Sequence, residues 1–348
     1  MAHAVEGSTP EEGTAALSAL IDPAEARRAR EGGRRLPDFF IVGHQKCGTT
    51  ALYKMIQDHP QIYLPVQKEP RFFITERPSR AAGGGRGRPA TLEEYLDLFS
   101  PARPEQKAGE ASPQYLQYAE APAAIAELNP QAKIIALLRE PVDFLRSYHG
   151  QMLHNRVETE KLFRKAMELE PARRRGECFP PGCNRRSWLL YSDQIRYREQ
   201  LSHVYASFPP EQVLVLIYEE YRRDNEAVVR EVLRFLEVDD TLPVELLETP
   251  PLKDVRLQRL HYLTASMQEA RRNPAAAGLG VRALDAAIPG AVRTRLGSAW
   301  RRLIYRPRAA PDSEFIAELR RRFKPDVEAV SDYLDKDLVS LWGYDRLA

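Results

Sequence analysis

The chain has 348 residues, of which 43% are hydrophobic and 29% are charged, which is the composition of an ordinary globular protein. Its net charge of +2 gives no reason to expect a nucleic-acid partner, and no apolar run is long enough to form a transmembrane segment. The N-terminus lacks the apolar core of a signal peptide and three cysteines are too few for a disulfide framework, so we expect a cytoplasmic protein.

The first residues differ in composition from the rest of the chain. Residues 1–36 are rich in Ala, Glu, Gly and Arg without a strong hydrophobic period, and we predict a mobile N-terminal tail with a short helix near Pro23–Arg30. The arginine clusters of this tail are expected to be solvated, with contact to an anionic surface as the alternative. Residues 37–348 are expected to form a single domain, because α/β folds of this length often do.

A glycine loop between a strand and a helix is the strongest local signal. The apolar run Phe39–Val42 is bounded by Pro37 and Gly43 and predicts a buried parallel strand. Gly43 and Gly48 bracket a tight loop, and the pattern becomes helical from Thr49 onward. In this arrangement backbone N–H groups and a helix N-terminus converge on an anion.

The loop has the glycine spacing of a nucleotide P-loop but a different lysine position. Lys46 precedes the second glycine, Gly48, and Thr49 and Thr50 follow it. In P-loop NTPases the lysine follows that glycine and the next hydroxyl holds Mg²⁺. A lysine on the loop itself suits a donor whose reactive group is attached to a 5′-phosphate and which needs no metal.

The segment Gly43–Thr50 resembles the 5′-phosphosulfate loop of sulfotransferases that use 3′-phosphoadenosine 5′-phosphosulfate (PAPS). The resemblance implies an α/β, P-loop-like three-layer fold, with a central parallel sheet flanked by helices. It also implies PAPS as the donor co-substrate, without a metal. The alternative is a glycine turn that binds no ligand. The donor-binding residues implied within the loop are Gln45, Lys46, Cys47, Gly48, Thr49 and Thr50.

The next short strand, Gln61–Leu64, leads to a candidate general base. Pro70 is expected to hold Glu69 in an extended conformation on a loop after this strand. Sulfuryl transfer to a hydroxyl needs a base, and ligands of open α/β sheets lie at the carboxyl ends of strands. The segment Lys68–Phe73 resembles one in the heparan-type carbohydrate sulfotransferases, whose glutamate is the base. The alternative is a surface glutamate paired with Lys68 or Arg71.

A helix with a capping-box start is expected over Thr91–Phe99. The following segment, Lys107–Tyr115, resembles the family's Glu-Lys-[Ser/Thr]-Pro-x-Tyr sequence, with Ala111 in place of the lysine. Ser112 either donates a hydrogen bond to the sulfate or only shapes the turn. The matching residues are Glu110, Ser112, Pro113 and Tyr115.

A second strand–helix junction supplies another candidate anion site. Ile134–Leu138 predicts a buried strand, Arg139 stands at its end, and Pro141 begins a helix that carries Ser147. Arginine presents a planar donor fork suited to phosphate. The pair Arg139 and Ser147 resembles the 3′-phosphate site of the PAPS-binding fold; the alternative is an ordinary junction with a surface arginine.

The segment Arg173–Arg186 is rich in proline, glycine and arginine. It is either an exposed loop with solvated charges or a surface that recognises an acidic acceptor.

A helix is expected over Trp188–Phe208, then a buried strand over Val213–Tyr218 and a helix from Glu219 onward. Because strands and helices alternate, we predict a parallel sheet with right-handed crossovers.

The C-terminal third carries weaker signals. Arg256 lies where members of the sulfotransferase family approach the 3′-phosphate with basic residues, so the resemblance adds it to the donor site. The family's glycine-containing basic loop is not recognisable around it. A last helix is expected over Leu319–Leu341, with a role in packing.

Together the resemblances imply transfer of a sulfuryl group from PAPS to the hydroxyl of a small-molecule or glycan acceptor. Amides and threonine hydroxyls of the loop would hold the 5′-phosphate, and Lys46 would neutralise the bridging oxygen as its bond to sulfur breaks. Glu69 would take the acceptor proton, and Arg139 with Ser147 would hold the 3′-phosphate. Two other functions remain open, a P-loop-type nucleotide kinase and a non-catalytic nucleotide-binding protein; the oligomeric state is not indicated.

Overall fold

The computed structural model describes residues 21–74, 88–181, 183, 185–244, 253–255, 305–307 and 312–347, with backbone alone for 253–255 and 305–307. Arg256, predicted to contact the donor, lies outside the described residues. In the part of the chain that is described, no helix combines the length and apolar character needed to cross a membrane.

Seven strands are described: β1(Phe39–Gly43), β2(Ile62–Tyr63), β3(Lys107–Ala111), β4(Lys133–Leu138), β5(Val213–Ile217), β6(Lys253–Val255) and β7(Tyr305–Pro307). The α-helices are α2(Pro23–Glu31), α3(Thr49–Ile56), α4(Leu92–Asp97), α5(Glu120–Leu128), α6(Pro141–His154), α7(Phe163–Glu168), α8(Glu170–Arg174), α9(Tyr197–Ser207), α10(Tyr218–Arg223), α11(Asn225–Phe235), α15(Ser313–Leu334) and α16(Leu338–Leu341). Short 3₁₀ helices connect them: η2(Pro113–Leu116), η3(Arg186–Leu189), η4(Ser192–Ile195) and η5(Pro210–Gln212).

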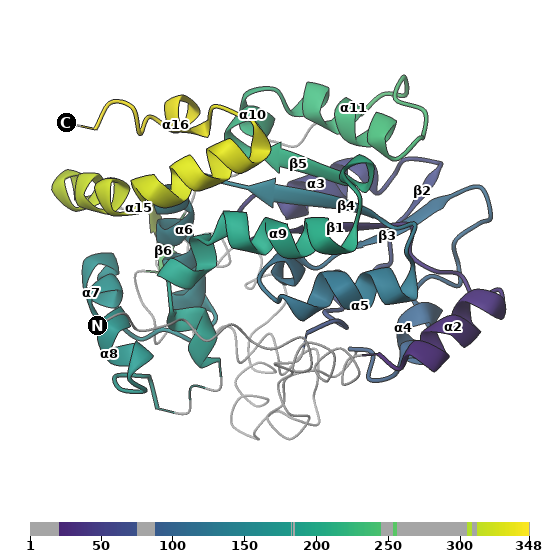
Figure 1. Ribbon diagram of the computed structural model, residues 1–348, viewed down its shortest axis with the longest axis horizontal. Coiled ribbons are helices and arrows are strands. Elements are labelled where there is room, and N and C mark those ends of the chain that lie inside the picture. The colour runs from purple at the N-terminus through teal and green to yellow at the C-terminus, as the bar shows by residue number, and fades with distance from the viewer. Residues whose placement is uncertain are drawn as a thin grey trace, which may run out of the picture.

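The central sheet has five strands in the order β2-β3-β1-β4-β5, and every neighbouring pair is parallel. Helices cover both of its faces, with α5 and α9 on one side and α3 and α11 on the other (Figure 1). Strands β6 and β7 form a separate antiparallel pair. The predicted α/β fold with a parallel sheet between two helical layers is therefore confirmed.

Strands β1 and β4 form the centre of the sheet because their sequences are continuously apolar. All five residues of β1 are buried, and so are the last five residues of β4. Parallel strands covered by helices on both faces have such runs rather than an alternating pattern. This pair was predicted from the sequence, and its carboxyl ends carry the two candidate anion sites.

Strand β3 was not predicted, because Lys107–Ala111 contains no apolar run. The strand nevertheless lies between β2 and β1, with Gly109 paired to Phe39. A Cβ atom at Gly109 would stand 2.4 Å from the Phe39 ring, so only glycine fits beneath this ring. Packing against the bulky residue of the neighbouring strand, rather than local propensity, determines the strand here.

Three predicted helices are divided in the structure. The helix expected from Glu219 onward is interrupted at Asp224, which separates α10 from α11. In the range 188–208, the end of η3 and all of η4 precede α9, which begins at Tyr197. The side-chain amide of Gln194 donates to the carbonyls of Ser187 and Leu190 in this segment. The last helix ends at Leu334, where Asp335 adopts a left-handed φ of 49°, and α16 follows separately.

The expected N-terminal tail is packed in its last part. Helix α2 lies where a short helix was predicted, is capped by Asp22, and contacts α5 through a face with buried Ala26 and Ala29. Its arginines are not all solvated, because Arg30 donates to the carbonyl of Glu127. The packed domain therefore begins upstream of Pro37.

The segment Arg173–Arg186 is not uniformly exposed. Arg173 is 2% exposed and its Nη1 lies 2.8 Å from Oε2 of Glu158, which is itself fully buried. The hydroxyl of Tyr191 donates to the same carboxylate. The prediction of solvated charges is therefore wrong for Arg173, which ties α8 to the chain after α6.

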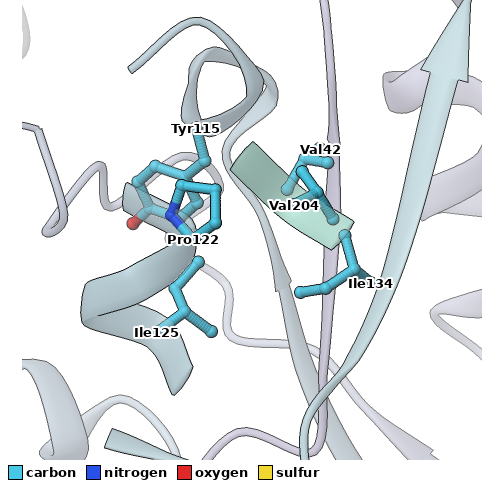
Figure 2. Close-up of a pocket in the computed structure, with 6 residues that line it drawn as sticks. All are labelled: Val42, Tyr115, Pro122, Ile125, Ile134 and Val204. Carbon is cyan, nitrogen blue, oxygen red and sulfur yellow. The ribbon is translucent and has the colours of Figure 1, made fainter. Parts of the chain in front are cut away.

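A small cavity of about 10 Å³ lies between the sheet and the helices α5 and α9 (Figure 2). Its walls are Val42, Tyr115, Pro122, Ile125, Ile134 and Val204. This volume is barely that of one water molecule, and the walls are apolar. The cavity is therefore a packing void and not a substrate site.

Candidate active site

The candidate site lies along one edge of the central sheet, where the parallel strands end. The glycine loop follows β1, and Arg139 follows β4, its neighbour in the sheet. The loop with Glu69 follows β2, and Ser112 follows β3. Because parallel strands bring their carboxyl ends to the same edge, segments far apart in the sequence meet there.

Sterics at both glycines determine the shape of the loop after β1. Gly43 has a φ of 134°, and a Cβ atom there would lie 2.4 Å from the carbonyl oxygen of Leu137 on β4. Gly48 has a φ of 93° and stands at the N-cap of α3. Lys46 also has a positive φ, 76°, which is uncommon for a residue with a side chain. The loop thus turns sharply and presents the first N–H groups of α3, which have no intrahelical partners, at the edge of the sheet.

His44 anchors this loop in the core and was missed by the sequence analysis. Its ring is fully buried; Nε2 lies 2.8 Å from Oε1 of Gln200, and Nδ1 lies 2.9 Å from Nε2 of Gln117. Burial lowers the pKa of His44 to about 4. The neutral ring, donating at Nε2 and accepting at Nδ1, satisfies both partners.

We expect acid to weaken this anchor. The pKa of His44 in the folded protein is below its ordinary value of 6.5, so its contribution to stability is present above pH 6.5 and is lost as the pH falls toward 4. The loss amounts to about 3 kcal/mol at most. The variant Gln117→Glu places an acceptor against protonated His44, so its melting temperature should fall less than that of the wild type between pH 7 and 4.5. Identical pH profiles of melting temperature for the two proteins would contradict this assignment.

Cys47 lies inside the loop, but its thiol faces the core. The side chain is fully buried, and burial raises the pKa of the thiol to about 12. It therefore stays protonated and unreactive. Only the backbone of Cys47 is placed to take part in anion binding.

Arg139 joins the end of β4 to the glycine loop. Its Nη1 donates to the carbonyl of Lys46 at 3.0 Å, and its guanidinium lies 4.5 Å from the centre of the Tyr218 ring. The side chain of Ser147, on α6, is 3% exposed. Neither Nε of Arg139 nor Oγ of Ser147 has a hydrogen-bond partner in the described part of the chain. Buried donors without partners are what an anion-binding site requires before its ligand arrives.

Two C-terminal aromatic residues hold the segment beside Arg139, a role that the sequence analysis did not assign. Tyr344 donates to Oε1 of Glu140 at 2.7 Å, and Trp342 donates to Oε2 of Glu219 at 2.8 Å. Oε1 of Glu219 in turn accepts the backbone N–H of Glu140. The C-terminal segment is therefore part of the support of the site, beyond the packing role predicted for it.

Replacing Arg139 by alanine is expected to weaken binding of adenosine 3′,5′-bisphosphate by about 10- to 100-fold, the usual loss for a charge-assisted hydrogen bond. Binding of 5′-AMP, which lacks the 3′-phosphate, should change by less than about threefold. Calorimetry with both nucleotides measures the two effects. Arg164→Ala, which removes an exposed arginine paired with Asp312, is the control. Equal losses for both nucleotides would show that Arg139 only supports the loop.

Glu69 lies between two cations. Its carboxylate contacts Arg71 and lies 3.2 Å from Nζ of Lys68, which also donates to Oγ1 of Thr50 at 3.0 Å. Burial alone would raise the pKa of Glu69, but Arg71 and Lys68 together lower it below its ordinary value. Glu69 is therefore ionised, and Lys68 connects it to the first turn of α3.

The backbone of this loop differs from the prediction. Glu69 has a φ of 58°, in the left-handed region, and Arg71 has a φ of 52°. The extended conformation expected from Pro70 is therefore wrong. Pro70, Phe72 and Phe73 are buried, so packing of the loop overrides the local preference.

Glu110 is the main titratable group that the sequence analysis did not assign. It is 1% exposed, and its carboxylate accepts hydrogen bonds from Tyr95, Ser112 and Tyr115. Burial raises its pKa to about 7, against the effect of these donors.

Of the two roles considered for Ser112, the structure supports the one in shaping the turn. Its hydroxyl donates to Glu110 and accepts from the amide of Arg71.

The structure thus brings together Lys46 with Arg139, and Thr50 with Glu69 through Lys68. Thr49 is buried, whereas Thr50 is exposed and Gln45 is half-buried. Among the residues with described side chains, no group of three His, Cys, Asp or Glu residues is arranged to hold a metal ion.

Comparison with known proteins identifies the family of the chain. The family model described as "Sulfotransferase domain" matches residues 36–274. A crystal structure of a sulfotransferase from Alicyclobacillus acidocaldarius superposes with a TM-score of 0.54 at 30% identity, covering 77% of this chain and 100% of that chain.

Two human proteins are also similar. The bifunctional heparan sulfate N-deacetylase/N-sulfotransferase 3 is 31% identical over 59% of this chain and 22% of its own length. The heparan sulfate glucosamine 3-O-sulfotransferase 3B1 is 27% identical over 66% of this chain and 53% of its own length. The chain thus matches about a fifth and about half of these relatives. The family match over most of the chain, with the parallel sheet and the glycine loop at its edge, shows that this chain belongs to the sulfotransferase domain family.

Proposed function

We propose that this protein is an enzyme that transfers a sulfuryl group from PAPS to the hydroxyl of an acceptor. The observation that supports this most strongly is the junction of the glycine loop with Arg139. The carbonyl of Lys46 accepts a hydrogen bond from the buried guanidinium, so two candidate anion sites on neighbouring strands are directly connected. A donor with phosphate at both ends of a nucleoside fits such a pair of sites.

The two ends of the donor are assigned to different strands. The amides from Gln45 to Gly48, with Thr49 and Thr50, would hold the 5′-phosphate at the start of α3. Arg139 and Ser147 would hold the 3′-phosphate with donors that are buried and otherwise unpaired within the described residues. Arg256 stays a prediction for the same end of the donor.

The proposed reaction needs one cation and one base. The acceptor oxygen forms a bond to sulfur while the bond from sulfur to the bridging phosphate oxygen breaks, and adenosine 3′,5′-bisphosphate leaves. Lys46 would neutralise the negative charge that develops on the bridging oxygen. Glu69, kept ionised by Arg71 and Lys68, would accept the proton of the acceptor hydroxyl.

We propose a carbohydrate hydroxyl as the acceptor, on a glycan or a glycosylated small molecule. The support is the similarity to a human heparan sulfate glucosamine 3-O-sulfotransferase and to mouse carbohydrate sulfotransferase 15, which is 28% identical over 58% of this chain. The loop from Lys68 to Phe73, which carries Glu69, resembles a segment of the heparan-type carbohydrate sulfotransferases and supports the same class of acceptor. We further propose that residues 37–348 act as a single domain, onto which helix α2 packs from the preceding segment.

A transfer assay tests the proposal. The protein is incubated with ³⁵S-labelled PAPS and a panel of oligosaccharides, phenols and amines, and labelled products are separated. Sulfation of an oligosaccharide hydroxyl is the expected result. Transfer from γ-labelled ATP with Mg²⁺ would instead indicate a kinase, and binding of adenosine 3′,5′-bisphosphate without any transfer would indicate a non-catalytic protein.

A further inference from the structure

A buried carboxylate lies behind the loop that carries Glu69. Glu110, on β3, is 1% exposed. Its Oε1 accepts hydrogen bonds from the hydroxyls of Tyr95 and Tyr115, both at 2.9 Å, and its Oε2 accepts one from Ser112 at 2.6 Å. We call these four residues the Glu110 cluster.

Two of the three hydroxyls also contact the backbone of the Glu69 loop. The amide of Arg71 donates to Oγ of Ser112 at 3.1 Å, and the amide of Phe72 donates to the hydroxyl of Tyr115 at 2.9 Å. Each hydroxyl donates its proton to Glu110, which fixes its orientation, and accepts from the loop amide with a lone pair. The hydroxyl of Tyr95 bonds to Glu110 but makes no such bond to a loop amide.

We propose that Glu110 is a positioning residue that acts through Ser112 and Tyr115 to hold Arg71 and Phe72, and thereby Glu69, in the geometry needed for proton transfer. The inference rests on the proposed role of Glu69 as the base. The inference adds a structural reason for the position of Glu69: the buried carboxylate of Glu110 orients the hydroxyls of Ser112 and Tyr115, and these hydroxyls hold the backbone of the loop.

The loop needs such support because its conformation is unfavourable by itself. Glu69 and Arg71 both have left-handed φ values, 58° and 52°, although neither is glycine. Arg71 also contacts the carboxylate of Glu69, so a shift of the Arg71 backbone moves the cation that orients the base. Displacements of this kind are costly because proton transfer depends on hydrogen-bond distances.

The charge of Glu110 matters for this arrangement. Glu69 on the adjacent loop, Tyr53 of α3 and Tyr95 of α4 face it, as do Ser112 and Tyr115; burial raises the pKa of Glu110 to about 7. An ionised carboxylate accepts from all three hydroxyls. A protonated one replaces an acceptor with a donor, so one hydroxyl loses the acceptor of its proton, and its orientation toward the loop amide is no longer fixed.

Hydrogen–deuterium exchange of the loop amides tests the contact directly, without an acceptor substrate. In Ser112→Ala and Tyr115→Phe, the amides of Arg71 and Phe72 should exchange at least about tenfold faster than in the wild type. Tyr95→Phe is the matched control, because it removes a bond of the same length to the same carboxylate oxygen from an equally buried ring. Equal exchange in Tyr95→Phe and Tyr115→Phe would overturn the proposal.

Kinetics distinguishes positioning from general stability. Release of adenosine 3′,5′-bisphosphate from PAPS is measured with the acceptor that gives turnover in the wild type. Tyr115→Phe should lower kcat about tenfold or more and leave KM for PAPS within about twofold. In the Glu69→Gln background the same substitution should change kcat by less than about twofold. Additive losses would show that Tyr115 does not act through Glu69.

The conservative variant Glu110→Gln supplies a pH readout. Its amide oxygen can still accept from the tyrosines, while its NH₂ group offers a donor to Ser112 as the protonated acid does. Because the amide does not titrate, kcat should be lowered at every pH, and the acid-side fall of kcat near pH 7 in the wild type should disappear. Persistence of that fall would contradict the role of Glu110. If the wild type transfers no sulfuryl group to any acceptor, the proposed function fails; the exchange experiment still decides whether the Glu110 cluster holds the loop.

Discussion

Replacing Lys46 by methionine is expected to lower kcat by about 10²- to 10³-fold, the range found when one preorganised stabiliser of a developing charge is removed. Methionine keeps the apolar part of the side chain and removes its charge. The bond from Arg139 goes to the backbone carbonyl of Lys46, so the connection between the two anion sites is kept. Affinity for adenosine 3′,5′-bisphosphate should therefore change by less than about tenfold.

The loop conformation requires a matched control. Lys46 has a φ of 76°, so every replacement is made in a left-handed position, and methionine carries the same backbone strain as lysine. Lys54→Met removes an exposed lysine of α3 and should leave kcat unchanged. A Lys46→Met protein with near wild-type kcat would remove Lys46 from the chemical step.

Replacing Glu69 by glutamine is the second substitution with a large expected effect, a loss of about 10²- to 10⁴-fold in kcat. The amide can still contact Lys68 but cannot take a proton. Arg71 and Lys68 hold the pKa of Glu69 below its ordinary value, whereas the pKa of Glu110 is about 7. The loss of rate caused by protonation of Glu69 should therefore occur at a much lower pH than the loss caused by protonation of Glu110. Rate measurements from pH 4 to 8 separate the two groups.

The exposed carboxylate Glu93, on α4, provides the comparison, and Glu93→Gln should have no effect on kcat. A Glu69→Gln enzyme that retained its rate would rule out Glu69 as the base. The structural alternative, in which Glu69 only neutralises Arg71 and Lys68, would then explain the ion pairs that surround it.

The parts of the fold that were predictable are those with continuous apolar sequence. Strands β1, β4 and β5 lie where apolar runs predicted them, and the glycine loop follows β1 as expected. Strand β3 was missed because Lys107–Ala111 contains no apolar run, and Gly109 is explained only by the Phe39 ring that lies above it. Such a contact between two distant segments leaves no local pattern in the sequence.

The residues of the site likewise fall into those that local sequence patterns predict and those that depend on contacts between distant segments. Lys46 and Arg139 follow apolar strands, so their position could be inferred from local patterns, and the structure places them in contact. Glu110 lies on the missed strand, and His44 is anchored by Gln117 and Gln200 from distant segments. Glu110 matches a family motif, but the roles of these buried polar groups were not predictable, because their partners are determined by the tertiary fold.

The central claim is that the ends of β1 and β4 bind the two phosphates of one nucleotide. A crystal structure with adenosine 3′,5′-bisphosphate tests it most directly. We expect the 5′-phosphate against the amides of the glycine loop and the 3′-phosphate within hydrogen-bond distance of Arg139 and Ser147. A nucleotide bound away from the carboxyl edge of the sheet, or with its 3′-phosphate remote from Arg139, would contradict the account.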